Sequence, residues 1–319
     1  MDEQLKAQVK NIIGEAAHIL VVSHIRPDGD AVGSILGLGL SLRAAGKDVQ
    51  MVLVDGVPAT FKHLSGSDTI NKRVKGEIDV SIVLDCSDLQ RVGDVLSKDT
   101  APTFNIDHHI TNLNFAQFNL VYPEIPSTAE ILVGLIPQLG LSIEKEAAEA
   151  LLTGMITDTL GFRTSNIHAD TLRTAADLME LGCDLPYLYN KALHFRSFEA
   201  VRYWGAGLST LEKEDRLLWA CLTQKDRQSI GYPGRDDADL INILSSIEEI
   251  DIAIIFVEQV NGSVKVSWRA QKGFDVSQIA SNFGGGGHKP AAGAEIEGDL
   301  ELVKIEVLEA TRNYLKSLQ

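Results

Sequence analysis

The sequence predicts an α/β protein with two lobes: an N-terminal lobe on a doubly wound, mainly parallel sheet, and a smaller C-terminal lobe of mixed α/β structure. Up to about residue 186, strand patterns and helix patterns follow one another, which favours parallel strands joined by crossovers. After residue 186 the pattern changes, and the dipeptide Asn261-Gly262 joins two β-rich runs as in a hairpin. With 319 residues, 45% of them hydrophobic, the chain is long enough for two domains.

The N-terminal lobe begins with helical spacing over residues 4–17, followed by the apolar run His18–Ser23, which is typical of a buried strand. Residues 30–45 place small residues and leucines at helical spacing, and Gly46 supplies the left-handed residue that commonly ends a helix. Further strands are predicted at 49–54, 80–84 and 103–106, and further helices at 127–138, 144–157 and 168–181.

The C-terminal lobe is expected to follow a helical connector rich in aromatic residues. Its strands, at 216–223, 251–260 and 263–269, are predicted to run in hairpin order, with helices at 237–248, 276–283 and 300–316. The predicted domains are therefore a catalytic, metal-binding domain at 1–186, a connector at 187–208 and a substrate-binding domain at 209–319.

Composition and charge limit the kinds of molecule that the protein is expected to bind. The net charge of −15 argues against a grip on long duplex DNA, which needs a basic face to neutralise phosphates. A few arginines and bound cations can reverse the sign locally, so short single strands or small nucleotides are favoured. Apolar runs such as Ile252–Val257 are shorter than the roughly 20 residues of a membrane span, so no membrane partner is expected. Three widely spaced cysteines and an amino terminus without a signal pattern favour a cytoplasmic protein.

Acids and histidines gather where the predicted strands end. In an open parallel sheet, ligands bind outside the carboxyl ends of the strands. Carboxylates mixed with imidazoles suit manganese, magnesium or a similar divalent ion, and the absence of cysteine argues against structural zinc. A single Asp after a strand is usually a cap or turn residue, but capping alone does not explain the whole set. The residues are His24, Asp28 and Asp30 after the first strand, Asp85, the run Asp107-His108-His109, and Asp158 after the helix 144–157.

These residues resemble the four motifs of a known family. The run His24–Ala31 (His-Ile-Arg-Pro-Asp-Gly-Asp-Ala), with the later acids and histidines, is similar to the DHH phosphoesterase family. The run Phe283–Gly293 resembles the signature of the first type of DHH-associated substrate domain, so the resemblance covers nearly the whole chain in the right order. Length and motif spacing look closest to bacterial oligoribonucleases of the nano-RNase type, which also dephosphorylate 3′-phosphoadenosine 5′-phosphate (pAp).

The resemblance implies a role for each position. It implies two divalent ions, with Mn²⁺ expected and Mg²⁺ or Co²⁺ as alternatives. Such a pair lowers the pKa of a bound water and clamps the attacked phosphate. Asp107 would orient a ligand histidine, and His109 would face the substrate and stabilise the phosphoryl group or the leaving oxygen. One ion would be held by His24, Asp28 and Asp85, and the other by Asp30, Asp85, His108 and Asp158, with Asp85 bridging.

Binding residues are also predicted outside this set. The glycines of 284–287 would let backbone N–H groups turn toward an anion, with His288 adding a donor, although such a run could also be a flexible linker. By resemblance, Arg269 would bind a substrate phosphate beside Gly285, Gly286, Gly287 and His288. Arg163 could reach the scissile phosphate or be a surface arginine. Residues 127–128 are expected mainly to cap a helix.

The predicted function is two-metal hydrolysis of short oligoribonucleotides, dinucleotides and pAp. We expect the lobes to hold the two ends of a short substrate. Two alternatives stay open: a phosphodiesterase specialised for linear pApA, and a non-catalytic nucleotide-binding regulator. A RecJ-like exonuclease and a DHH-type pyrophosphatase are disfavoured by the short acidic chain and by the glycine-rich run, respectively. The sequence leaves open whether the protein is a monomer or a homodimer.

Overall fold

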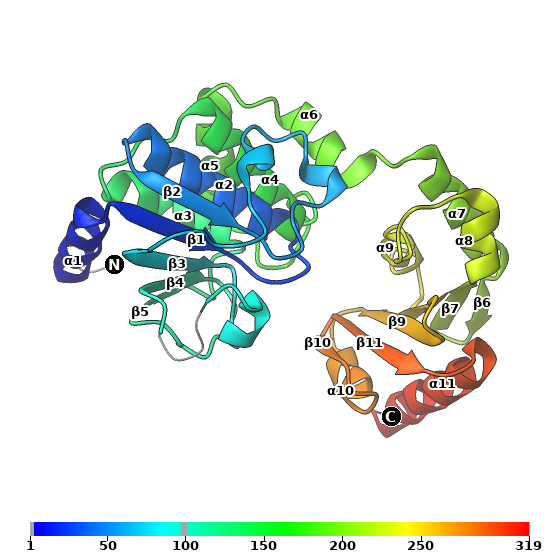
Figure 1. Cartoon of the computed structure of the whole chain (residues 1–319). Helices are drawn as coiled ribbons and strands as arrows, with labels where there is room; N and C mark the ends of the chain where they lie inside the picture. Colours follow the sequence, from blue (N-terminus) through cyan, green and yellow to red (C-terminus); the bar gives the residue numbers. More distant parts are fainter. Residues whose placement is uncertain (1–2, 97–100, 319) are drawn as a thin grey trace. The chain divides into compact units, whose positions relative to one another are not determined.

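The computed structural model describes residues 3–96 and 101–318, and for residue 288 the backbone alone. The chain divides into two compact units, of which the first ends at Phe195 and the second begins at Arg196 (Figure 1). In the described residues, no helix has the length and apolar character that a membrane span requires.

The N-terminal unit contains a five-stranded parallel sheet with the strand order β2-β1-β3-β4-β5. The chain places β2 on one side of β1 and then returns to place β3 on the other side. This is a doubly wound order, whose reversal between β1 and β3 marks the expected ligand site at the carboxyl ends of these strands. The strands are β1 (His18–Val22), β2 (Asp48–Val52), β3 (Val80–Leu84), β4 (Phe104–Asp107) and β5 (Phe118–Val121).

Helices α2, α3 and α4 cover one face of this sheet, on the same side in Figure 1, and share its main apolar core. The other face packs a smaller cluster against connecting segments. Helices α2 and α4 pack closely because Gly33 and Gly154 leave no Cβ between them. The helices are α1 (Glu3–Glu15), α2 (Gly29–Ala44), α3 (Thr128–Gln138), α4 (Lys145–Asp158), α5 (Ala169–Glu180) and α6 (Leu185–Tyr189). Short helical turns lie at η1 (Ala59–Phe61), η2 (Ser67–Thr69), η3 (Leu89–Val92) and η4 (Asn190–His194).

The helices and strands predicted in this unit are present, with ends shifted by at most two residues. The strand β5 was missed. Its sequence, Phe-Asn-Leu-Val, is short, and only Leu120 is buried, so its pattern is weak. It forms because parallel pairing with β4 completes the edge of the sheet.

The C-terminal unit contains a six-stranded mixed sheet with the order β10-β11-β9-β8-β7-β6. The hairpin across Asn261-Gly262 is confirmed, because β8 and β9 pair antiparallel and Gly262 has a φ of +82°. The predicted hairpin order of β7 and β8 is wrong: they pair in parallel, because a crossover containing two helices joins them. The strands are β6 (Glu212–Glu214), β7 (Leu217–Leu222), β8 (Ile252–Glu258), β9 (Ser263–Ala270), β10 (Gly286–His288) and β11 (Ala291–Glu297).

Two apolar clusters sandwich this sheet. One lies under α10 and α11, and the other packs α7 and α9 on the opposite face. The helix predicted at 237–248 is shorter, because Ala238 and Asp239 adopt positive φ values of 53° and 66° and delay its start. The helices are α7 (Phe198–Ser209), α8 (Gln224–Ile230), α9 (Leu240–Leu244), α10 (Val276–Ser281) and α11 (Leu300–Ser317).

Candidate metal centre

The predicted ligand residues meet at the carboxyl edge of the parallel sheet. His24 lies two residues beyond β1, Asp85 directly follows β3, and His108 directly follows β4. Asp158, the last residue of α4, lies with its Oδ2 3.5 Å from His108 Nε2. Parallel strand ends bring His24, Asp85 and His108 to one edge, and the end of α4 adds Asp158, which lies 134 positions after His24 in the chain.

Asp85 stands at the middle of this site. Its Oδ2 lies 3.4 Å from Nε2 of His24, and its Oδ1 lies 3.6 Å from Nε2 of His108. The two oxygens therefore face two different groups of side chains. The residue has a φ of +53° and donates its backbone N–H to the carbonyl of Ile106 at 2.9 Å. Aspartate is one of the few residues that adopt this backbone conformation readily, which suits it to the position.

The two acids after β1 are held by the starts of helices. Asp28 is the N-cap of α2, its Oδ1 accepting the N–H of Ala31 at 3.0 Å, and its Oδ2 lies 3.8 Å from His24 Nε2. Asp30 is buried and accepts the backbone N–H groups of Thr128 and Ala129 at 2.7 and 2.9 Å. Because the first N–H groups of a helix have no partner within it, those at the start of α3 are free to donate hydrogen bonds to this carboxylate.

A turn with an unusual backbone follows Asp158. Leu160, Gly161 and Phe162 all have positive φ values, between 50° and 72°. The hydroxyl of Thr159 holds the turn by donating to the carbonyl of Met155 and accepting the N–H of Phe162. This turn ends α4 directly after Asp158, so the carboxylate is presented at the end of the helix.

Asp107 and His109 form a separate pair beside these ligands. Oδ1 of Asp107 lies 2.7 Å from Nδ1 of His109, and Oδ2 accepts a hydrogen bond from Nδ2 of Asn112 at 2.6 Å. Asp107 was expected to orient a ligand histidine. The structure places it against His109, the histidine expected to face the substrate, and its role in orienting a ligand histidine stays a prediction.

The pKa values in the site are shifted because several buried carboxyl groups lie close together. Burial, together with repulsion from Asp85, holds the pKa of Asp30 and that of Asp158 well above the ordinary value. Burial also raises the pKa of Asp85, but its hydrogen bond with His24 and the neighbouring histidine charges outweigh this and hold the pKa below the ordinary range. Burial lowers the pKa of His109, but the Asp107 hydrogen bond and nearby carboxylates outweigh it and raise the pKa to about 9.

This donor set fits divalent cations. Carboxylate oxygens and imidazole nitrogens converge in a buried place where the carboxylates repel one another, and cations would relieve that repulsion. Three groups of side chains offer ligand atoms that lie within 4.8 Å of one another. They are His24, Asp28 and Asp85; Asp30, His108 and Asp158; and Asp85, His108 and His109.

The remaining predicted residues lie outside this cluster. Arg163 is exposed, and its Nε donates to the carbonyl of Leu160 at 3.2 Å. Arg269 lies on β9 in the C-terminal unit, where burial lowers its pKa against the opposing charges of Asp237 and Asp239. The predicted role of the His288 side chain lies outside what the structure describes.

The glycine run 284–287 is ordered: its last two glycines belong to an edge strand, and the first two lead into that strand. The alternative, a flexible linker, does not describe it. Gly286 and Gly287 belong to β10, which pairs with β11. A Cβ at Gly285 would lie 2.2 Å from the carbonyl oxygen of Gly293, and a Cβ at Gly287 would lie 2.5 Å from that of Ala291. Only glycine permits this close approach. The register also sets backbone positions 288 and 269 on either side of Ala291, in one row across the sheet.

Comparison with known proteins identifies the chain. The model of the DHH family, N-terminal domain, matches residues 18–155, and the model of the DHHA1 domain matches residues 229–317. A protein of Thermus thermophilus named bifunctional oligoribonuclease and PAP phosphatase NrnA is 35% identical over 304 residues, which cover 93% of this chain and 90% of that protein. The chain belongs to the DHH family.

Two further relatives bear on the fold and on the metal. The crystal structure of an exopolyphosphatase-related protein from Bacteroides fragilis superposes with a TM-score of 0.90 at 28% identity, covering 99% of this chain and 96% of that one. A probable manganese-dependent inorganic pyrophosphatase of Streptococcus agalactiae is 29% identical over 249 residues, covering 74% and 76%. The predictions of the DHH family and of the α/β fold are confirmed, and as a DHH protein the chain is a metal-dependent phosphoesterase.

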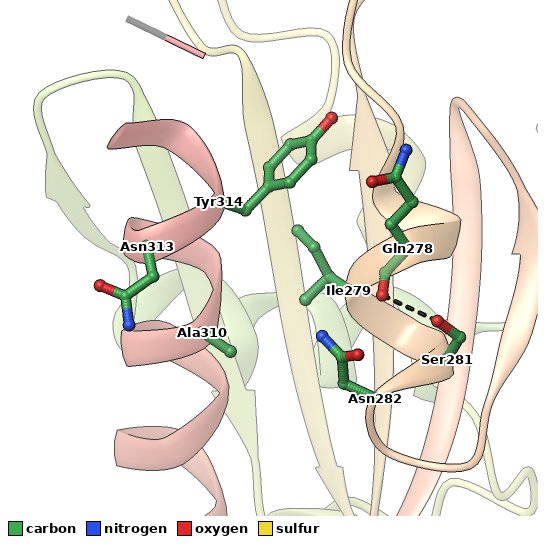
Figure 2. Close-up of a pocket in the computed structure, with 7 residues that line it drawn as sticks. All are labelled: Gln278, Ile279, Ser281, Asn282, Ala310, Asn313 and Tyr314. Carbon is green, nitrogen blue, oxygen red and sulfur yellow. Dashed lines mark hydrogen bonds between the residues drawn. The ribbon is translucent and has the colours of Figure 1, made fainter. Parts of the chain in front are cut away.

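The C-terminal unit of this DHH protein also has a pocket of about 570 Å³ between α10 and α11 (Figure 2). Figure 2 shows neutral polar side chains around it, including Gln278, Asn282 and Tyr314. Trp268 packs toward α11, so the next residue, Arg269, belongs to the opposite face of the sheet. The pocket therefore lies on the other face from the predicted phosphate-binding arginine.

Two residues beside the DHH metal centre were missed or underrated from the sequence. Asn112 holds Asp107, and its Nδ2 also lies 2.7 Å from Oδ1 of the buried Asn105. Thr128, expected mainly as a helix cap, contacts both Asp30 and Asp85, while Ser127 is the actual N-cap of α3. A Ser-Thr pair at a helix start signals a cap, but nothing in the local sequence shows which carboxylate the helix start will meet.

Proposed function

We propose that this chain hydrolyses the phosphate esters of short oligoribonucleotides and dinucleotides, and converts pAp to AMP, with two divalent metal ions. The observation that carries the proposal is Asp85, whose two oxygens face His24 on one side and His108 on the other. A carboxylate in this arrangement is placed to bridge two cations. Two-cation sites of this kind serve displacement at phosphorus.

The residues around Asp85 divide into two ligand sets. His24 and Asp28 would complete one set with Oδ2 of Asp85, and His108, Asp158 and Asp30 would complete the other with Oδ1. Oxygen and imidazole donors suit Mn²⁺, which the name of the streptococcal relative also mentions, and Mg²⁺ or Co²⁺ would fit the same donors. When bound, two such ions neutralise phosphate charge and make a hydroxide available near neutral pH.

His109 would act on the substrate directly. Asp107 holds its Nδ1, so the imidazole would present Nε2, with a proton, to a phosphoryl oxygen or to the departing oxygen. The hydrogen bond with Asp107, which is not in either ligand set, raises the pKa of His109 and favours this protonated ring. Arg163 would add a positive charge near the scissile phosphate if its exposed side chain turns toward Asp158.

The C-terminal unit would bind a phosphate of the substrate away from the scissile one. Arg269 supplies the charge, and Gly285, Gly286 and Gly287 bring the backbone close with no side chain in the way. His288 would add a hydrogen-bond donor, because positions 288 and 269 lie on either side of Ala291 in the sheet. A second anchoring phosphate would favour short substrates with a terminal phosphate over long ones.

The choice of substrate rests on two supports. The Thermus relative, aligned over about nine-tenths of both chains, is named for oligoribonuclease and PAP phosphatase activities. The net charge of −15 disfavours long duplex DNA as a partner. We further propose residues 1–186, 187–208 and 209–319 as catalytic domain, connector and substrate-binding domain, in a cytoplasmic protein.

The test is a product analysis with Mn²⁺ and equal concentrations of pAp, pApA, a five-nucleotide RNA and a twenty-four-nucleotide RNA. Rapid loss of pAp and the short RNA, with the long RNA spared, is expected. Cleavage of pApA alone would assign the protein to linear dinucleotides, and no cleavage of any substrate would leave a binding protein. Asp85→Asn is the control, because it keeps the side-chain shape while removing the bridging charge, and it should be inactive.

The contribution of the C-terminal unit is tested by Arg269→Ala. The variant should lose activity on pAp and on the short substrates, so that its preference for them over the long RNA falls, with Mn²⁺ binding unchanged. Unchanged relative rates across the substrates would rule out Arg269 as the second anchor.

A further inference from the structure

The first turn of α3 provides a side chain whose position has a consequence for metal binding. Ser127 caps the helix by accepting the N–H of Glu130 at 3.1 Å, which leaves the side chain of the next residue, Thr128, available for other contacts. Thr128 is fully buried. A buried hydroxyl is retained where it has hydrogen-bond partners, and those of Thr128 are carboxylates of the metal centre.

Thr128 contacts acids from two different elements. Its backbone N–H donates to Oδ2 of Asp30 at 2.7 Å, and its Oγ1 donates to Oδ1 of Asp85 at 3.1 Å. One residue thus ties the start of α2 to the end of β3. Hydrogen bonds to charged acceptors are about twice as strong as neutral ones, so both contacts hold their carboxylates firmly.

The hydroxyl of Thr128 contacts one of the two oxygens of Asp85. A carboxylate turns easily about its Cβ–Cγ bond, because that torsion has only broad minima. Oδ1, the oxygen that Thr128 holds, is the one on the His108 side, 3.6 Å from Nε2. Oδ2 is held separately, 3.4 Å from His24.

We propose that Thr128 is a positioning residue that fixes the rotation of Asp85 and thereby supports the cation site on the His108 side more than the site on the His24 side. The inference rests on the proposed function in assuming two bound cations. Without the hydroxyl, the carboxylate can pivot about its Oδ2 end, which stays beside His24, so Oδ1 is displaced from His108 more than Oδ2 is from His24. Loss of outer hydrogen bonds to metal ligands typically weakens metal affinity by about 10–100-fold.

The experiment is calorimetric titration of the metal-free full chain with Mn²⁺. Thr128→Val keeps the shape and the backbone N–H to Asp30 and removes only the hydroxyl. One of the two binding events should weaken by about 10–100-fold while the other changes little. Thr128→Ser, which restores a hydroxyl, should recover both affinities.

A matched control is Thr153→Val. Thr153 is equally buried in the same unit, and its hydroxyl donates to the carbonyl of Glu149 within α4. This variant should bind Mn²⁺ as the wild type does, so a general effect of losing a buried hydroxyl would be recognised. If Thr128→Val does not fold by circular dichroism, Thr128→Ala removes the same hydroxyl with a smaller side chain.

The outcomes separate cleanly. Wild-type affinity at both events in Thr128→Val or Thr128→Ala overturns the inference, as does equal weakening of both events. A single binding event in the wild type overturns it as well. If the wild type binds two ions but hydrolyses none of the substrates, the proposed function fails while the role of Thr128 is still decided by the titration.

Discussion

The contact between α2 and α4 allows the cost of one added methyl group to be worked out. A Cβ at Gly33 would lie 2.5 Å from the carbonyl oxygen of Ala150 and 2.9 Å from the backbone nitrogen of Gly154. Ordinary contact is about 3.5 Å, so Gly33→Ala requires the helices to separate by about 1 Å. Both opposing atoms belong to the backbone of a helix, so they cannot turn aside as a side chain could.

Two opposing free energies set the effect on stability. Overpacking of this kind costs about 1–3 kcal/mol, and replacing glycine by alanine inside a helix returns about 1 kcal/mol. We therefore expect the free energy of unfolding to fall by about 0–2 kcal/mol. The effect on catalysis should be larger, because α2 carries Asp30 and α4 ends in Asp158. A displacement of about 1 Å between catalytic groups costs about 100-fold in rate.

The assay compares Gly33→Ala with Gly134→Ala. Gly134 is exposed in α3 and a Cβ there would meet nothing within 4 Å, so this control should keep full activity and gain about 1 kcal/mol. Unfolding in urea is followed by far-UV circular dichroism, because all three tryptophans lie after Phe195. If Gly33→Ala matches the control in both kcat/KM and stability, the helix spacing does not set the metal centre as argued.

Two further predictions concern the metal centre itself. Asn112→Ala should lower kcat by about 10-fold and leave Mn²⁺ affinity unchanged, because the lost hydrogen bond holds Asp107, and through it His109, rather than a residue of the two ligand sets. Asn112→Asp cannot donate a hydrogen bond to Asp107, so it should be as slow as Asn112→Ala. A loss of bound metal in either variant would contradict this assignment. Chelation of the metal should lower the stability of the N-terminal unit by about 5 kcal/mol relative to Mn²⁺ at 100 times the Kd of both sites, or about 2.7 kcal/mol for each ion lost. Tryptophan fluorescence, which reports the other unit, should keep its unfolding transition, and a shift of that transition alone would place the metal elsewhere.

The sequence by itself predicted the parallel sheet and the acids and histidines that gather at its carboxyl edge. His24, Asp85 and His108 could be found because each directly or nearly follows a strand, and all parallel strands end at one edge. Their place at one edge therefore follows from the parallel direction of the strands, while their proximity depends on the sheet order, in which β1, β3 and β4 are neighbours. The hairpin at Asn261-Gly262 could be predicted because a short turn needs only local backbone freedom, which Gly262 supplies with its positive φ.

Only the tertiary structure decided how these residues are held. The N–H of Thr128 meets Asp30 across 98 residues of sequence, and its hydroxyl meets Asp85 across 43. The parallel pairing of β7 with β8 depends likewise on a crossover that packs against the sheet. Local sequence records that a helix begins at Thr128 and that its first N–H groups need acceptors. Which carboxylate fills that need depends on how the helices pack against the sheet, and no short stretch of sequence contains that information.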